Sequence, residues 1–243
     1  MSMQTVLILG AASDVGQALA KQFYSAGFQL VLAARNTADI ESYLNTWSDK
    51  GKITCIPFDA CDFANHKNWM EKLPTVPDIT ICVFGYLGDQ AKAMEEWNES
   101  ERIINTNYSG AVSMLNVIGG VYARRGSGII VGISSVAGDR GRQSNYIYGS
   151  AKAGFTAYLS GLRNKMLSHG VHVLTVKPGF INTKMTAGLK LPKALTASPD
   201  QVAKRIYNGV HSRQNVIYVL PIWFLIMLII RLIPEFIFKR LKL

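Results

Sequence analysis

The chain of 243 residues has few cysteines and few histidines, three of the first and four of the second. Cys55, Cys61 and Cys82 have neither metal-ligand spacing nor the paired framework of a disulfide-stapled domain. We therefore expect reduced thiols in a cytosolic protein. The histidines have no metal-ligand spacing either, and we expect no metal site.

The sequence also lacks a membrane-spanning run and a secretory signal. Its uncharged apolar stretch near the C-terminus is about fifteen residues long, short of the roughly twenty that a spanning helix needs. The N-terminus enters an apolar segment at once, without a basic region, an apolar core and a cleavage site. These absences predict a cytoplasmic location.

Acidic residues are scarce in the last quarter of the chain. From Lys184 onward there are ten Lys and Arg residues, opposed only by Asp200 and Glu235, so this part carries eight of the chain's ten net positive charges. Such an imbalance favours an anionic partner, such as a phosphate-bearing substrate or an acidic lipid, over ordinary solvated surface. Nucleic acid ranks last, and we expect none, because no aromatic residues are interleaved with the basic ones in a binding motif.

What the sequence does contain is an alternation of apolar strand-like runs and helical segments. About half of its residues, 49%, are hydrophobic, which is enough for a large core. Alternating strands and helices predict a Rossmann-like α/β fold, a doubly wound parallel sheet with helices on both faces and ligand at the carboxyl ends of the strands. The seven predicted strands are residues 5–9, 29–34, 53–58, 78–84, 128–133, 171–176 and 215–220. Helices are predicted over about 94–119 and from Tyr148 to about His169, and Ser198-Pro199 predicts the start of a further helix.

A turn of small residues follows the first strand and precedes a predicted helix over 17–26. Small residues allow the backbone to approach a pyrophosphate, and a helix N-terminus supplies N–H donors and the positive end of a dipole. The spacing departs from GxGxxG, since Asp14 stands where a middle glycine is common. We expect the pyrophosphate of a dinucleotide to contact Gly10, Ser13, Asp14, Val15 and Gly16.

The ends of the second and third strands favour NADP. An acid after the second strand would bind a ribose 2'-hydroxyl, whereas Arg35, followed by Asn36, suits the 2'-phosphate of NADP. NAD stays possible, and an exposed strand-end Arg is the plain alternative. Asp59, followed by Ala60, suits an adenine amino group or a helix cap.

The segment 135–152 carries the candidate chemistry. Ser135 follows the fifth strand, and Tyr148 and Lys152 are four residues apart, so a helix would project both from one face. An ammonium nearby lowers the pKa of a Tyr, which is otherwise near 10. The set could protonate a carbonyl as hydride arrives. For an isolated pair, an exposed helix with a snorkelling Lys is the alternative.

The last residues, 221–243, alternate large apolar residues with basic ones. We expect a tail outside the catalytic domain 1–220, either lying in a membrane interface or buried in an oligomer contact. Trp223 and the basic residues of the tail favour the membrane interface.

Taken in order, these motifs resemble the short-chain dehydrogenase/reductase family over about residues 1–220. The resemblance rests on the turn 10–16, Asp59, Asn107, Ser135, Tyr148, Lys152, and Pro178-Gly179 with Thr183. The family's Asn-Asn-Ala-Gly is replaced by Cys82-Val83-Phe84-Gly85, which retains only the glycine.

The resemblance implies roles for these positions. Tyr148 is the implied acid, Ser135 positions the ketone oxygen, Lys152 also holds the nicotinamide ribose, and Asn107 positions a relay water. Implied cofactor contacts are Phe84, Gly85, Tyr148, Lys152, Pro178, Gly179, Ile181 and Thr183. A homo-oligomer, dimer or tetramer, is expected as well.

Residues 84–89, residues 134–140 and the tail further resemble the decaprenylphosphoryl-2-keto-erythro-pentose reductases within that family. That resemblance implies a lipid-linked phosphoryl sugar as substrate, a flavin-dependent oxidase as partner, and a place at the inner face of the cell membrane. In the covering segment 183–197, Lys184, Lys190 and Lys193 favour an anion. The alternatives are a reductase of an uncharged lipid ketone, such as a 3-oxoacyl or steroid-like compound, a non-catalytic NADP-binding protein, and a membrane scaffold.

Overall fold

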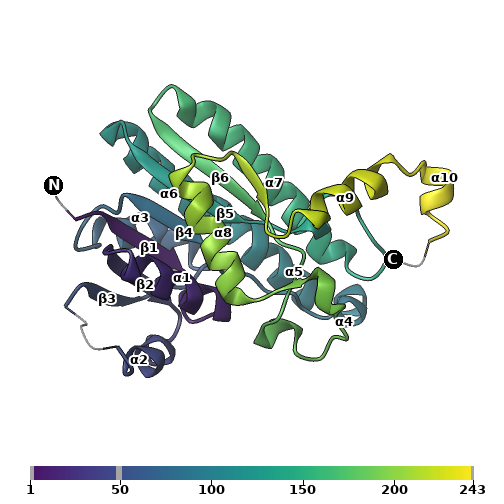
Figure 1. The fold of residues 1–243 in the computed structure, drawn as a ribbon, viewed down its shortest axis with the longest axis horizontal. Helices are drawn as coiled ribbons and strands as arrows, with labels where there is room; N and C mark the ends of the chain where they lie inside the picture. Colours follow the sequence, from purple (N-terminus) through teal and green to yellow (C-terminus); the bar gives the residue numbers. More distant parts are fainter. Residues whose placement is uncertain (1–2, 48–50, 242–243) are drawn as a thin grey trace.

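The structure, a computed structural model, describes residues 3–47 and 51–241. Its centre is a parallel sheet of seven strands in the order β3-β2-β1-β4-β5-β6-β9 (Figure 1). Each of the seven predicted strands is present in it. The strands are β1 (Thr5–Leu9), β2 (Gln29–Ala34), β3 (Ile53–Pro57), β4 (Ile79–Cys82), β5 (Gly128–Ile133), β6 (Val171–Lys177) and β9 (Val216–Tyr218).

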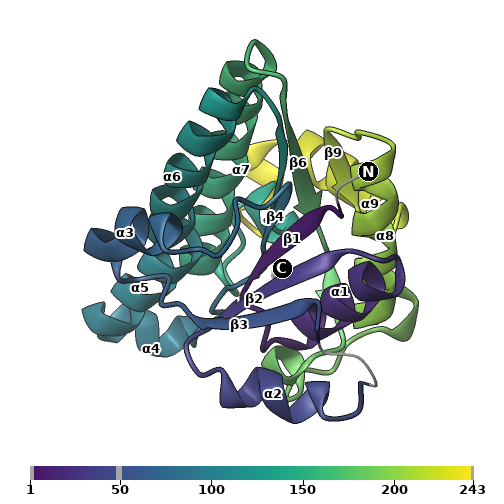
Figure 2. The ribbon, with the colours of Figure 1, turned by 90° about the vertical axis from the view of Figure 1, so that its left-hand side faces the viewer.

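Helices cover both faces of this sheet, as Figure 2 shows with α1 and α8 on one side and α3, α6 and α7 on the other. The strand runs are mostly apolar because alternate side chains point to opposite faces and both faces are buried. Val6 and Ile8 pack under α1 and α8, whereas Leu7 and Leu9 pack under α6 and α7. The helices are α1 (Asp14–Ser25), α2 (Ala38–Leu44), α3 (His66–Glu71), α4 (Gln90–Glu95), α5 (Trp97–Ile104), α6 (Gly110–Arg125), α7 (Tyr146–Leu167), α8 (Pro199–His211), α9 (Ile222–Leu232) and α10 (Glu235–Phe238).

The strand order reverses between β1 and β4, the place where such sheets bind ligands. The helix that leaves β1 begins there with a side-chain cap, since Ser13 Oγ accepts a hydrogen bond from Gly16 N at 3.0 Å. Helix α8 begins at the predicted Ser198-Pro199, in a capping box with Gln201.

The helix predicted over about 94–119 is wrong as a single element. The extended backbone of Glu96, with φ −116° and ψ 110°, separates α4 from α5. From Trp97 the helix continues through a π-helical turn, Asn105–Ser109, into α6. The helix predicted to reach His169 ends at Leu167. A second sheet of two short strands, β7 (Phe180–Ile181) and β8 (Thr196–Ala197), was not predicted.

The C-terminal residues form α9 and α10, which project from the body of the domain in Figure 1. The first turns of α9 nevertheless pack on the domain, because Trp223 and Met227 are buried together with Val136. Most other apolar side chains of α9 and α10 are exposed. No helix within residues 3–47 and 51–241 is long and apolar enough to cross a membrane.

The side chain of Arg140 ties the end of the tail to the loop after β5. Its guanidinium donates to the carbonyl oxygens of Ile230 at 2.5 Å and Ile233 at 2.6 Å, and it pairs with Glu235 at 2.8 Å. It also lies 3.7 Å from the ring centroid of Phe238. The boundary at residue 220 between the domain and the tail stays a prediction. The packing of Trp223 and Met227 shows that part of the tail lies against the loop after β5.

Candidate active site

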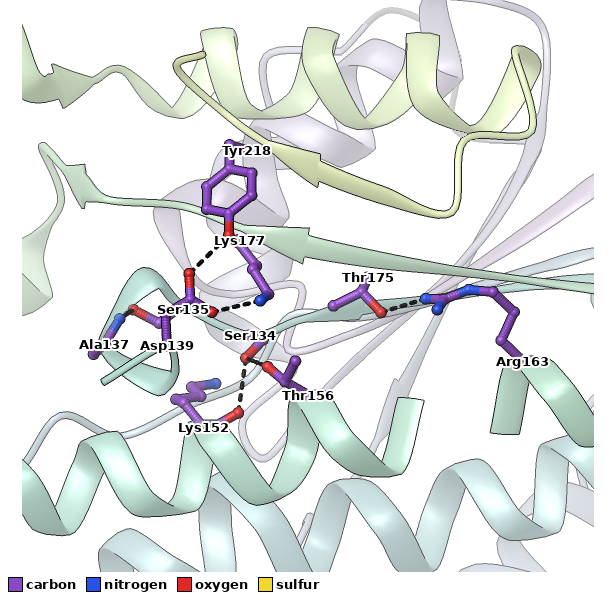
Figure 3. Close-up of polar contacts among 10 residues, drawn as sticks. All are labelled: Ser134, Ser135, Ala137, Asp139, Lys152, Thr156, Arg163, Thr175, Lys177 and Tyr218. Carbon is purple, nitrogen blue, oxygen red and sulfur yellow. Dashed lines mark hydrogen bonds and ion pairs between the residues drawn. The ribbon is translucent and has the colours of Figure 1, made fainter. Parts of the chain in front are cut away.

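Ser135 lies just beyond the end of β5 and opens a 3-10 helix, Val136–Gly138. Its Oγ accepts a hydrogen bond from Ala137 N at 3.1 Å, which orients the hydroxyl. The preceding Ser134 binds the helix that carries the other candidate residues, because its Oγ donates to Lys152 O at 2.9 Å and lies 2.6 Å from Thr156 Oγ1 (Figure 3). The end of β5 and the first half of α7 are therefore fastened together at the candidate site.

A close approach of backbones brings these two elements together. A Cβ atom on Gly138 would lie 2.7 Å from backbone atoms of Lys152 and Ala153, and one on Gly149 would lie 2.9 Å from Ala137 O. Only glycine fits at both places. The structure thus brings together Ser135, Tyr148 and Lys152 as the spacing predicted.

The ammonium of Lys152 is buried and bound. Its Nζ donates to the carbonyl oxygen of Ile133 at 3.1 Å and lies 5.7 Å from the ring centroid of Tyr148. Burial lowers the pKa of Lys152 to about 8. The ammonium is held where β5 ends, close to the phenol.

The prediction that Lys152 lowers the pKa of Tyr148 is not what this structure gives. Burial raises the pKa of Tyr148 to about 12, and the hydrogen bond from Ser135 opposes that rise only in part. The phenol is therefore protonated at neutral pH. A protonated phenol beside a hydroxyl suits donation of a proton to a carbonyl oxygen.

Asn107 lies in the π-helical turn, and its side chain makes three hydrogen bonds. Its Nδ2 donates to Tyr86 O at 2.6 Å and Ile103 O at 2.8 Å, while its Oδ1 accepts from Tyr86 N at 3.2 Å. Gly85 lies beside it: an added Cβ would be 3.0 Å from Asn107 Oδ1 and 3.5 Å from Lys152 Nζ. Single π turns of this kind are frequent at functional sites, and this one places Asn107 next to Lys152.

A cleft of about 520 Å³ lies at the carboxyl ends of β1, β2, β3 and β4. At its floor Gly10 has φ +97°, and a Cβ there would lie 2.7 Å from Phe84 N, so the close approach requires glycine. The predicted cofactor residues that line this cleft are Gly10, Ser13, Arg35, Asn36, Asp59, Ala60, Phe84 and Gly85. Asp59 also accepts a hydrogen bond from Cys61 N at 2.9 Å within its own turn. It is not a helix cap, because the next helical turn begins at Phe63 with Asp62 in the capping position.

Three residues of the glycine turn do not line the cleft. Asp14 accepts a hydrogen bond from Lys184 N at 2.7 Å and so fastens the start of α1 to the segment after β7. Val15 is buried in the core. A Cβ on Gly16 would lie 2.5 Å from Gly10 O, so Gly16 allows α1 to pack on the turn.

A second cavity, of about 480 Å³, contains Ser135 and Tyr148. Pro178, Gly179, Ile181 and Thr183 line this cavity and not the first. Met185 lines both, so the two spaces adjoin. A more open depression of about 580 Å³ between α5 and α7 contains neither Ser135 nor Tyr148. The chemistry therefore belongs to the second cavity, which we call the catalytic cavity.

The walls of the catalytic cavity correct one expectation and add residues that the sequence did not reveal. Lys184, Lys190 and Lys193 are exposed and do not line it; from the covering segment the lining side chains include Met185, Thr186 and Leu189. The additional lining residues include Leu87, Asp89, Gln90, Arg142, Asn145, Phe180 and Trp223. In the sequence, only the position of Arg142 between Ser135 and Tyr148 indicates that this residue could line the site. No group of His, Cys, Asp and Glu within the described residues has the geometry of a metal site.

Several known proteins are similar to this chain in sequence and in fold. The family described as short chain dehydrogenase matches residues 4–193. An uncharacterized oxidoreductase of Mycobacterium tuberculosis (strain ATCC 25618 / H37Rv) is 34% identical, over 97% of this chain and 96% of that protein. The ketoacyl reductase HetN of Nostoc sp. is 26% identical, over 89% of this chain and 78% of that protein.

Among solved structures, a short chain dehydrogenase from Burkholderia cenocepacia J2315 in complex with NADP has a TM-score of 0.84. It is 16% identical and the match covers 100% of this chain and 98% of that one, so it shows the common fold. The family match spans more than half of the chain and agrees with the seven-stranded parallel sheet. The chain belongs to the short chain dehydrogenase family of oxidoreductases.

Proposed function

We propose that the protein is an NADPH-dependent reductase of a ketone on a lipid-linked substrate, and in its most specific form of the 2-keto group of a polyprenyl-phosphoryl pentose. The observation that carries the proposal is the catalytic cavity, where the Ser135 hydroxyl and the protonated Tyr148 phenol meet apolar walls such as Phe180 and Trp223. Cavities of this size accept a sugar or the start of a lipid chain.

The residues of the cleft fit a dinucleotide phosphate. The close approach at Gly10 and the capped start of α1 suit a pyrophosphate. Arg35 and Asn36 line the end of β2 and suit a 2'-phosphate, while Asp39 also lines the cleft and accepts a hydrogen bond from Asn36 Nδ2 at 3.3 Å. The Burkholderia dehydrogenase of the same fold binds NADP, which agrees with this choice.

In the proposed reaction bound NADPH supplies the hydride. Tyr148 donates its phenolic proton to the ketone oxygen. Ser135 Oγ accepts from Ala137 N, and its O–H, which is hydrogen-bonded to Tyr148, turns to donate to the same ketone oxygen. Lys152, held by Ile133 O, returns a proton toward Tyr148, and Asn107 orients a water in that relay. By family resemblance Lys152 also binds the nicotinamide ribose.

The surroundings support a lipid-linked substrate and a place at a membrane surface. The exposed apolar residues of α9 and α10 lie near Arg231, Lys239 and Arg240, a combination suited to an acidic lipid surface. A flavin-dependent oxidase that makes the ketone, and assembly into a homo-oligomer, complete the proposal. The ketoacyl reductase among the relatives supports the rival, a reductase of an uncharged 3-oxoacyl lipid.

The test is NADPH oxidation by the purified protein with a polyprenyl-phosphoryl 2-ketopentose made in place by a flavin oxidase. A phosphate-free lipid ketone, a 3-oxoacyl thioester and NADH run beside it, with Tyr148→Phe as the inactive control. Turnover confined to the phosphorylated ketone supports the specific form. Turnover only on the uncharged ketones supports the rival. No turnover on any of them, with NADPH bound, contradicts reduction altogether.

A further inference from the structure

Several polar atoms in the catalytic cavity have no hydrogen-bond partner within the protein. In the part of the chain that the structure describes, four buried side-chain atoms lack a partner: Gln90 Nε2, Arg142 Nε, Asn145 Oδ1 and Gln214 Oε1. The first three belong to residues that line the catalytic cavity. Buried polar groups are nearly always bonded, so three exceptions among the residues that line one cavity show hydrogen bonding that the protein itself leaves incomplete there.

Two of these atoms are hydrogen-bond donors whose identity is fixed. Gln90 Oε1 accepts from Ile147 N at 3.2 Å, and therefore the remaining atom of that carboxamide is the NH2 group. Arg142 Nε is a donor in every protonation state that a protein reaches. The amide of Asn145, at the start of α7, can turn to present either its oxygen or its NH2. Two residues that line the cavity thus each carry a buried N–H group without an acceptor within the protein.

The charge of the cavity points to the kind of acceptor. Its charged lining residues are Asp89 and Arg142. The carboxylate of Asp89 is used as the cap of α4, accepting from Lys92 N at 3.0 Å. The carboxylate nearest in sequence to Arg142, Asp139, binds Lys177 and Tyr218 instead (Figure 3). Among the described residues Arg142 has no ion-pair partner.

We infer that Arg142 and Gln90, assisted by Asn145, form a binding subsite for the phosphate of the substrate, on the same cavity wall as Ser135 and Tyr148. The inference rests on the proposed function and specifies its substrate as a phosphate ester whose charged group lies close to the ketone. A planar guanidinium binds phosphate through parallel hydrogen bonds. Arg142 takes the role that the sequence had assigned to Lys184, Lys190 and Lys193, which do not line the cavity.

The experiment compares Arg142→Gln and Arg142→Lys with Lys190→Gln, which removes an exposed charge outside the cavity. We expect Arg142→Gln to raise KM for the phosphorylated ketone about 10-fold to 100-fold, the range of a lost charge-assisted hydrogen bond. Arg142→Lys should recover part of that loss, and Lys190→Gln should leave KM unchanged. KM for a phosphate-free lipid ketone and the Kd of NADPH should be unchanged in all three variants.

A binding measurement separates this inference from the reaction. Farnesyl phosphate and farnesol are titrated against wild-type protein and Arg142→Gln, with tryptophan fluorescence as the readout because Trp223 lines the cavity. Preference of the wild type for farnesyl phosphate, lost in Arg142→Gln, supports the subsite even if no ketone is reduced. Equal binding of both ligands, or the same affinity in wild type and variant, overturns the subsite even if ketones are reduced. If Arg142→Gln fails to fold, failure of inorganic phosphate to compete with farnesyl phosphate on the wild type overturns it as well.

Discussion

The cofactor cleft and the catalytic cavity adjoin at Met185 but are built in different ways. Most of the cleft is lined by the ends of the first four strands, within residues 10–106. The cavity is lined by residues 87–91, a loop between β5 and α7, the segment 178–189, and Trp223. Most residues of the cleft come from one part of the sequence, whereas the residues of the cavity come from distant parts that the fold brings together.

The comparison indicates where the chemistry and the specificity reside. Parallel strands bring their carboxyl ends to one edge in chain order, so a dinucleotide site follows from the order of strands. Ser135 and Tyr148 line the catalytic cavity. A Cβ on Gly85, which lines the cleft, would lie 3.5 Å from Lys152 Nζ, so the candidate catalytic residues lie at the junction of the two spaces. The remaining cavity walls depend on loops and on α9, whose positions are set by tertiary packing. We therefore expect variants of the cleft to change cofactor affinity, variants of the cavity wall to change substrate affinity, and variants at the junction to change turnover.

The largest effect is expected at the junction. Tyr148→Phe removes the proton donor and retains the ring, and loss of a general acid lowers kcat by about 10²–10⁴. The Kd values of NADPH and of the ketone should stay near those of the wild type. Steady-state rates, with fluorescence titration of NADPH, measure both. Turnover close to the wild-type value would remove Tyr148 from the catalytic role.

The next effect tests whether the tail is a wall of the cavity. Trp223 is buried, its Nε1 donates to Leu195 O at 3.0 Å, and its ring packs edge-on against Phe180. Replacing a buried Trp by Ala costs about 3–5 kcal/mol in unfolding free energy, and Trp223→Ala should also raise KM for the ketone without changing the Kd of NADPH. Leu225→Ala, at an exposed position of the same helix, is the control and should change neither. Urea unfolding and steady-state kinetics distinguish them; equal behaviour of the two variants would place α9 outside the site.

The sequence predicted the cleft better than the cavity, and the reason is physical. After their first residues, the strand runs at 5–9 and 29–34 are apolar at every position because both faces of the sheet are covered. The four-residue spacing of Tyr148 and Lys152 places them one helical turn apart. Such local signals need no knowledge of distant contacts.

The features that the sequence did not predict depend on such contacts. Trp223 was interpreted as part of an interfacial tail, because an apolar helix face has the same pattern whether it meets lipid or the rest of the domain. No sequence pattern near Glu96 predicts the extended backbone that divides α4 from α5. Whether Arg142 or the lysines of 183–197 face the cavity is decided by loop conformation, which no periodicity records.

The variant Arg35→Ser tests cofactor binding in the cleft without changing the catalytic cavity. The loss of a charge-assisted contact to a 2'-phosphate, about 1.5–3 kcal/mol, should raise the Kd of NADPH about 10-fold to 100-fold. The Kd of NADH should stay the same, since it has no 2'-phosphate. Asp39→Asn, which removes the acid that lines the same cleft, is the matched control and should not weaken NADPH. Fluorescence titration measures the Kd of both nucleotides. Equal losses of affinity for NADPH and NADH would contradict the role of Arg35.

Lys152 provides a test by pH. The pKa of Lys152 is lowered to about 8 from 10.5 by burial, so between these values the unfolded chain binds the proton that the folded protein has released. Stability attributable to Lys152 is therefore gained as pH rises from 8 to 10.5 and lost as pH falls through 8. At 1.36 kcal/mol per pKa unit, the unfolding free energy of the wild type should gain about 2 kcal/mol relative to Lys152→Met between pH 7 and pH 10. Urea unfolding at both pH values measures it, and a constant difference between the two proteins would show that the ammonium is not buried.

The smallest effect lies at the far end of the tail. Glu235 is 77% exposed where it pairs with Arg140, and exposed ion pairs contribute about 0.2–1 kcal/mol. Glu235→Gln should therefore change the unfolding free energy by less than about 1 kcal/mol, with KM for the ketone unchanged. Arg140→Ala should have the larger effect, because it also removes hydrogen bonds to Ile230 and Ile233 and the contact with Phe238. Urea unfolding and the rate of tryptic cleavage near Arg231 compare the two. Equal effects would mean that the carbonyl contacts of Arg140 contribute nothing, and that the tail is held by the burial of Trp223 and Met227 alone.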